Sequence, residues 1–182
     1  RAYSEQFDGY FPAPSQRDKP VVAGFYAPLL LETGYLPEPA SLYCPASPPK
    51  GRLPSLATTT CRTERSAPPK VADLSFVYGY TLGYVSHGEY RPVRCLNRST
   101  YAVMADPPLE NVAAGGEHVR GPHGCRGQNV LFEDGHVTYL TCVKLPSTDD
   151  DLFLNRLGHV APGVDRDDSV VARGTTPITS RP

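Results

Sequence analysis

The stretch QNVLFEDGHVTYLT, residues 128–141, contains the strongest fold signal in this chain. Two runs with the look of strands, 128–133 and 136–141, flank the pair Asp134-Gly135. An Asp-Gly pair between two such runs is typical of a two-residue β-hairpin turn. The stretch therefore predicts two antiparallel strands joined by a tight turn.

Two further segments have the aromatic and β-branched composition of strands. Residues 74–84 read LSFVYGYTLGY, and residues 100–105 read TYAVMA before an Asp-Pro-Pro sequence. Both segments are expected to pair with the hairpin in one antiparallel sheet, because strands with this composition need neighbours on which to pack.

Helices are expected to be short and few. Glycine and proline, 16 and 20 residues of 182, make up about a fifth of the chain, against roughly 12% in average proteins. Proline in a helix interior removes a hydrogen bond and clashes with the preceding turn. Short helices are predicted before Gly9 and from near Ala27 to Gly34, since glycine commonly follows the last helical turn.

The predicted fold class is therefore a strand-dominated α+β protein: an antiparallel sheet with short helices and long loops rich in proline and glycine. We expect one domain over residues 1–148 and a C-terminal extension over 149–182 that packs on the domain or on a neighbouring subunit. From Val160 onward the extension has few large apolar residues, so we expect a partner chain to order this tail. Residues 1–20 and 160–182 are predicted to make much of that contact.

Charge and hydropathy exclude several classes of partner. The chain has 18 basic and 19 acidic residues, a formal net charge of −1. Neutralising nucleic-acid phosphates or binding an anionic membrane surface needs a basic surplus, so neither partner is expected. No apolar run approaches the roughly 20 residues of a membrane span, and none is predicted in this chain.

The five cysteines are spread along the chain without any Cys-x-x-C pair, which disfavours zinc-ribbon and thioredoxin-like sites. Such spacing in a proline-rich chain favours an exported protein with disulfides, located outside the cell or on its surface. The alternative is a cytosolic protein with scattered buried thiols. We predict Cys125–Cys142, because the hairpin register places Cys142 opposite Gly127, and also Cys44–Cys61, leaving Cys95 single.

Candidate catalytic groups do not form a complete set in the sequence. His123, Asp134 and His136 invite a metal or acid–base interpretation, but an aspartate before glycine is also expected from turn chemistry alone. Ser86-His87 and Asp106 have the residue types of a hydrolase triad. No Gly-x-Ser-x-Gly elbow presents the serine, so a hydrolase is disfavoured.

Two acidic clusters are weak candidates for calcium, because hard oxygen ligands suit that ion. The alternative is a pair of solvated acidic loops. The candidate ligands are Asp149, Asp150, Asp151, Asp165 and Asp167. Asn97-Arg98-Ser99 is a formal N-glycosylation sequon, which makes Asn97 a candidate glycan acceptor.

The stretch from His123 to Val137 resembles the signature of prepilin-like proteins that are abundant in planctomycetes and their relatives. That signature is a histidine, nine residues and Asp-Gly, usually within Asn-Val-Leu-Phe-x-Asp-Gly-His-Val. Here ten residues separate His123 from Asp134, and residues 129–137 match closely. The resemblance identifies these motif residues: His123, Asn129, Asp134, Gly135 and His136.

Further matches extend the resemblance over most of the chain. They are Asp-Gly-Tyr-Phe-Pro at 8–12, Gly-Tyr-Leu-Pro at 34–37, Leu-Tyr-Cys-Pro at 42–45, the strand at 75–83, Ala-Asp at 105–106, and a C-terminal extension at 150–171.

The resemblance implies a pilin-like fold, in which an N-terminal helix packs on an antiparallel sheet, and it implies no catalytic activity. The leading prediction is an extracellular structural subunit that self-assembles into a filament or surface fibre, with copies of itself as partners and no cofactor. The alternative is a monomeric pseudopilin-like surface module that binds calcium or glycan.

Overall fold

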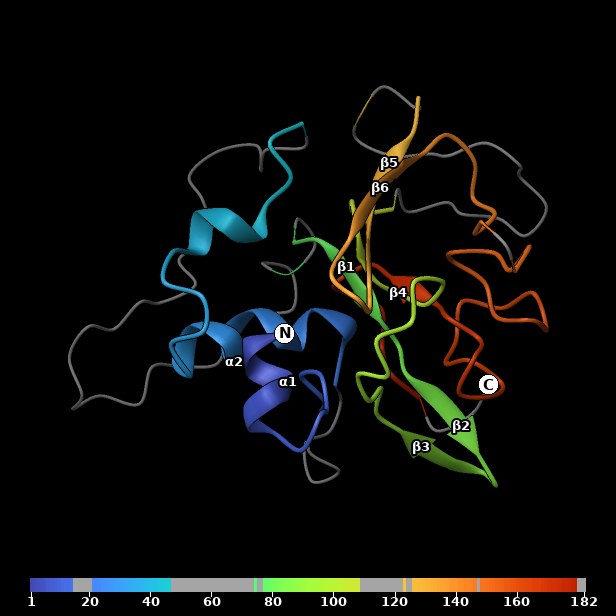
Figure 1. Ribbon diagram of the computed structural model, residues 1–182, viewed down its shortest axis with the longest axis horizontal. Helices are drawn as coiled ribbons and strands as arrows, with labels where there is room; N and C mark the ends of the chain where they lie inside the picture. The colour runs from blue at the N-terminus through green and yellow to red at the C-terminus, as the bar shows by residue number, and fades with distance from the viewer. Residues whose placement is uncertain are drawn as a thin grey trace.

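The computed structural model describes residues 1–14, 21–46, 74, 77–108, 123, 126–146 and 148–179. Within these residues the fold is a strand-dominated α+β structure with one five-stranded antiparallel sheet, a separate two-stranded hairpin and two short α-helices (Figure 1). This confirms the predicted fold class at that level.

The five-stranded sheet has the order β6-β5-β4-β1-β7, and every neighbouring pair in it is antiparallel. Strands β2 and β3 form the separate hairpin. The strands are β1 (Gly79–Thr81), β2 (Tyr84–Ser86), β3 (Glu89–Arg91), β4 (Ala102–Ala105), β5 (Gln128–Phe132), β6 (Val137–Leu140) and β7 (Val171–Ala172). All four segments predicted as strands contain one or more of them.

The register of the β5–β6 hairpin differs by one residue from the prediction. Gln128 pairs with Leu140, whereas a two-residue turn at Asp134-Gly135 would place Gln128 opposite Thr141. A type I′ turn needs positive φ at both central residues, but here only Gly135, with φ of 96°, has it. The Gly135 N–H donates to the Phe132 carbonyl at 2.9 Å. Gly135 is thus the extra residue of a bulged turn.

Both predicted helices are present, and glycine ends each of them. Helix α1 spans Ala2–Gln6, and Gly9 (φ of 83°) donates its N–H to the Ser4 carbonyl at 2.8 Å. Helix α2 spans Tyr26–Glu32, follows the 3₁₀ turn η1 (Ala23–Phe25), and is closed by Gly34 with φ of 77°. A second 3₁₀ turn, η2, covers Pro39–Leu42.

The sheet is packed between two layers of chain. The helices lie to one side of it and the chain that follows β6 lies to the other (Figure 1). On the helix side, Tyr26 stacks on Tyr80 of β1 with ring centroids 4.5 Å apart. On the other side, Val130 and Phe132 of β5 pack in one buried cluster with Phe153 from the C-terminal segment.

The C-terminal segment is built into the same core. Strand β7 pairs with β1, and the segment after it donates or accepts backbone hydrogen bonds with residues 21–24. Val170 and Val171 are both fully buried. Contacts within the chain hold the described part of this segment, as one of the two predicted packings has it. Contact of residues 1–20 and 160–182 with another copy stays a prediction. Main-chain pairing with β1 and the burial of Val170 and Val171 both hold the segment in place.

Candidate functional site

The structure divides the residues of the prepilin-like motif between the two ends of the β5–β6 hairpin. Asp134, Gly135 and His136 form the turn, whereas His123 and Asn129 lie at the opposite end, beside Asp106. His123, Asp134 and His136, which invite a metal or acid–base interpretation in the sequence, are therefore not grouped in space. The intervening strand β5 separates them by its whole length.

The turn residues interact with one another. Asp134 Oδ1 accepts the His136 backbone N–H at 3.1 Å and lies 2.6 Å from His136 Nδ1. These two hydrogen bonds, with the backbone one the larger effect, lower the pKa of Asp134. The His136 ring stacks on Phe132 with centroids 4.5 Å apart. All these contacts are local, as the turn-chemistry interpretation of Asp134 expects.

At the other end, four residues from separate segments meet. Asp106, which follows β4, is 2% exposed, and its Oδ2 accepts both the backbone and the side-chain N–H of Asn129, at 2.7 and 3.0 Å. His123 Nε2 lies 2.9 Å from the same Oδ2 and 3.4 Å from the sulfur of Cys44. We call Cys44, Asp106 and His123 the Cys-Asp-His cluster.

This cluster is the one group of three or more metal-ligating side chains found among the described residues, with its ligand atoms all within 4.8 Å of one another. Burial and the nearby Cys44 and Asp106 raise the pKa of Tyr78, which lies beside the cluster. The side chain of His123 is 27% exposed, so the cluster has one face toward solvent.

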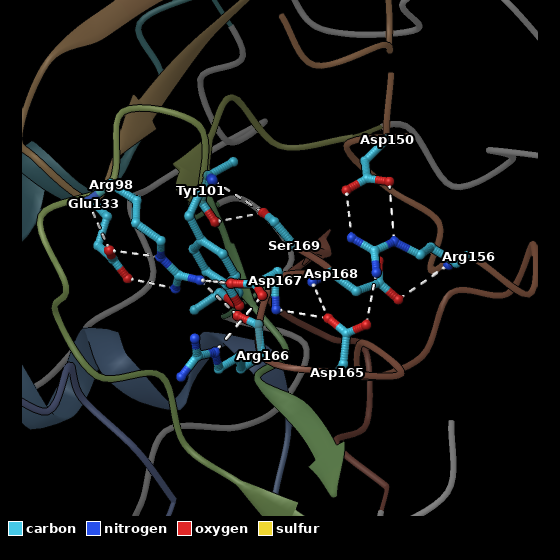
Figure 2. A network of polar contacts seen from close by, with 12 residues as sticks. Arg98, Tyr101, Glu133, Asp150, Arg156, Asp165, Arg166, Asp167, Asp168 and Ser169 are labelled. Atoms are coloured by element: carbon cyan, nitrogen blue, oxygen red, sulfur yellow. Dashed lines mark hydrogen bonds and ion pairs between the residues drawn. The ribbon is translucent and has the colours of Figure 1, made fainter. Parts of the chain in front are cut away.

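A second polar centre ties the hairpin turn to the C-terminal segment (Figure 2). Arg98 binds the carboxylate of Glu133 in a two-pronged contact, Nη2 to Oε1 at 2.8 Å and Nε to Oε2 at 2.9 Å. Its Nη1 donates to Asp167 at 2.8 Å, and the guanidinium lies 4.1 Å from the centre of the Tyr101 ring. The Glu133 side chain is fully buried.

A third polar centre lies within the C-terminal segment (Figure 2). Arg156 pairs with Asp150 at 3.2 Å and with Asp165 at 2.7 Å. Asp168 is fully buried, and its Oδ2 accepts the backbone N–H groups of Arg156 and Val164. Burial raises the pKa of Asp168. Its Oδ1 has no hydrogen-bond partner among the residues that the structure describes.

The candidate calcium ligands are distributed over these contacts, and no three of them come together in the part of the chain that the structure describes. Asp150, Asp165 and Asp167 pair with arginines. Asp151 Oδ1 accepts the Phe153 N–H, and the Asp149 carbonyl accepts from Lys144. The guanidinium groups of the arginines bind these carboxylates, because their planar geometry matches that of a carboxylate. They occupy the positions that a calcium ion would need.

The predicted Cys125–Cys142 disulfide is not formed in this structure, because Cys142 carries a free thiol whose sulfur lies 3.6 Å from the Lys144 carbonyl. The bulge at Gly135 shifts the register, so Cys142 is no longer opposite Gly127. Cys125 lies outside the described residues. Cys61 does too, and the structure shows no disulfide at Cys44, so the predicted Cys44–Cys61 bridge is not observed. Cys95 carries a free thiol.

The remaining candidates are separate from both ends of the hairpin. Ser86 and His87 contact each other at the β2–β3 turn, 3.1 Å from Oγ to Nδ1. Asp106 contacts Asn129 and His123, so Ser86, His87 and Asp106 do not form a hydrolase triad. Asn97 is exposed with φ of 61°, and its glycosylation stays a prediction.

Comparisons with protein-family models, with curated protein sequences and with solved structures found no match for this chain. The resemblance to prepilin-like proteins therefore remains an expectation from the motif residues. Among the described residues, no helix has the length and hydropathy to cross a membrane.

Sequence reasoning missed the meeting of Cys44 and Asp106 with His123. Each residue was singled out separately, in a disulfide prediction, a disfavoured triad and a motif. One signal was available: three separate segments of the same resemblance, at 42–45, 105–106 and 123, each contributed one of these metal-ligating side chains.

Proposed function

We propose that this chain is an extracellular structural subunit, pilin-like, that self-assembles through its sheet edge into a filament or surface fibre. The observation that carries the proposal is the position of β6. It forms one edge of the five-stranded sheet in the described part of the chain. Val137 and Tyr139 on this edge are 60% and 48% exposed.

A second copy of the same chain is the partner that fits this edge. An exposed edge strand can pair with another chain through main-chain hydrogen bonds, and natural proteins usually protect it with charged residues or proline. Strand β6 reads Val-Thr-Tyr-Leu, with neither. The net charge of −1 also means that copies repel one another little.

The resemblance to prepilin-like proteins supports the same role, since it implies an assembling, non-catalytic subunit. The short N-terminal helix beside an antiparallel sheet agrees with that expectation. The C-terminal segment, in contrast, is engaged within its own subunit, so the proposal assigns assembly to β6.

Electron microscopy and light scattering of the purified chain and of Val137→Lys test the proposal. We expect filaments or larger assemblies for the natural sequence and monomers for Val137→Lys, because a lysine on an edge strand opposes pairing. Val160→Lys is the matched control, since Val160 is 45% exposed but outside the sheet, and it should assemble normally. A natural chain that stays monomeric at every concentration, or equal assembly of both variants, contradicts the proposal.

A further inference from the structure

The Cys-Asp-His cluster does not have the connections of a catalytic triad. In such a triad the nucleophile and the carboxylate contact different nitrogens of the histidine ring. Here the sulfur of Cys44 and Oδ2 of Asp106 both face Nε2 of His123, at 3.4 and 2.9 Å. One nitrogen carries at most one proton, so it cannot receive a proton from the thiol while donating one to the carboxylate.

The same arrangement suits a metal ion, because ligand atoms of three different kinds lie within 4.8 Å of one another. A tetrahedral zinc ion, about 2.3 Å from sulfur and about 2.0–2.1 Å from nitrogen, places those two atoms about 3.6 Å apart. The observed separation of Cys44 Sγ and His123 Nε2 is 3.4 Å. The nitrogen–oxygen pair at 2.9 Å needs to widen by only about 0.4–0.5 Å.

Burial and charge favour a divalent cation at this place. Cys44 and Asp106 are 1% and 2% exposed, and a thiolate formed beside a carboxylate at this depth would be costly without a cation between them. A thiolate, a carboxylate and a neutral imidazole around a divalent ion sum to zero charge. His123, with 27% of its side chain exposed, leaves a route for the ion and room for a water as fourth ligand.

Asn129 supplies the outer support that metal ligands usually have. It donates two hydrogen bonds to the Asp106 carboxylate, from its backbone and its side chain, which fixes the orientation of that ligand. The ligand types then select the ion. Sulfur and imidazole nitrogen favour zinc and related transition metals, whereas calcium and magnesium take oxygen ligands.

We propose that Cys44, Asp106 and His123 bind one Zn²⁺ ion, which joins the segment after η2 to the end of β4 and to the residues before β5. The site goes beyond the proposed assembly function and does not depend on it. Such an ion ties the helix-side layer to the sheet and adds its binding free energy to folding.

Cobalt spectroscopy on the natural chain, purified under reducing conditions, tests the proposal directly. Titration with Co²⁺ should reach one equivalent, with visible bands of tetrahedral geometry and a near-ultraviolet sulfur-to-cobalt charge-transfer band that Zn²⁺ then abolishes. Absence of the charge-transfer band, or binding without a fixed stoichiometry, overturns the proposal. This readout needs no variant to fold.

Zinc affinity of variants, measured by competition with a chromogenic chelator, identifies the ligands. Cys44→Ser, Asp106→Asn and His123→Ala should each weaken Zn²⁺ binding by more than 100-fold, and Asn129→Ala by about 10–100-fold. Cys95→Ser and His136→Ala are matched controls with expected affinity unchanged. Circular dichroism checks that each variant is folded. A folded Cys44→Ser variant with natural affinity refutes the assignment.

Assembly and metal binding separate cleanly in these experiments. Val137→Lys should lose assembly and still bind one Zn²⁺, whereas a failed zinc titration leaves the filament result unaffected. A disulfide at Cys44, detected by peptide mapping of the protein after reductant-free purification, overturns zinc binding at this site, because an oxidised sulfur is no longer a thiolate ligand.

Discussion

At the scale of single residues, the buried ion pair of Arg98 and Glu133 gives a direct test of stability. Glu133 has a fully buried side chain, and Arg98 is its paired cation. Removing one partner of a buried pair costs about 3–5 kcal/mol, because the remaining charge stays buried without compensation. We expect Arg98→Met to lower the free energy of unfolding by this amount in urea denaturation.

Two further variants control this prediction. Arg91→Met breaks the exposed pair with Glu89, whose side chains are 50% and 69% exposed, and should cost less than about 1 kcal/mol. Adding Glu133→Gln to Arg98→Met removes the uncompensated charge and should recover part of the loss. If Arg98→Met is as mild as Arg91→Met, the buried pair does not have the assigned role.

At the scale of elements, the β5–β6 turn depends on the conformation of Gly135. Its φ is 96°, and an added Cβ would meet no atom within 4 Å. Substitution of Gly135 therefore causes backbone strain without a clash. For an ordinary residue this strain lowers the free energy of unfolding by roughly 1–2 kcal/mol. Gly135→Val should destabilise the protein by at least this amount, while Gly135→Asn should cost less, because asparagine tolerates positive φ.

Thermal unfolding of both variants measures that difference. Gly127→Ala is the comparison variant, because its Cβ would lie 2.6 Å from the Leu140 carbonyl and the Tyr139 ring. This clash pushes β6 from β5, so Gly127→Ala should lower the melting temperature more than Gly135→Asn does. Equal effects of Val and Asn at 135 would show that the turn is not held in the left-handed region.

This turn also shows how far the sequence predicts the fold. The Asp-Gly pair and the strand-like runs on either side of it correctly predict the hairpin, because these signals are local. The Asp-Gly pair suits both a two-residue turn and a bulged one. Burial of Glu133 against Arg98 is a long-range contact, which the local sequence pattern does not contain. The prediction therefore missed the register by one residue, and with it the disulfide at Cys142.

The sequence singled out each residue of the candidate site, but it did not predict that these residues meet in space. His123 and Asn129 were identified from the motif, but Cys44 reaches His123 only through the folding of distant segments. The acidic clusters were interpreted as calcium ligands because their neighbours in sequence are acidic. Their partners in space are Arg98 and Arg156, of which Arg98 is remote in sequence from the carboxylate it binds.

At the scale of the whole molecule, the C-terminal segment couples stability to pH. Asp168 is fully buried there beside the main-chain N–H groups of Arg156 and Val164. Burial, the largest effect, raises its pKa above the ordinary 3.8, and the Asp150 charge adds to this, while the N–H groups and Arg156 oppose it. The folded state therefore binds this proton more tightly than the unfolded state.

The sign of the effect follows from that difference. The contribution of Asp168 to stability is complete below pH 3.8, the pKa of an ordinary aspartate, and is lost as pH rises through the raised pKa of the folded state. Asparagine does not titrate and can still accept the two N–H groups. The free energy of unfolding of the natural chain minus that of Asp168→Asn should therefore fall as pH rises above 3.8.

Urea denaturation of both chains across this pH range measures the difference. Subtracting the two free energies of unfolding removes the effect of carboxylates that both chains share. Asp134 is one of these, and its pKa is lowered by its hydrogen bonds from His136. The contribution of Asp134 to stability is therefore lost as pH falls, opposite to that of Asp168. Asp8→Asn removes an exposed carboxylate and shows the effect of losing one charge alone. A difference that rises with pH for Asp168→Asn would mean that Arg156 and the two N–H groups outweigh burial, and that the C-terminal segment is held by an ionised Asp168.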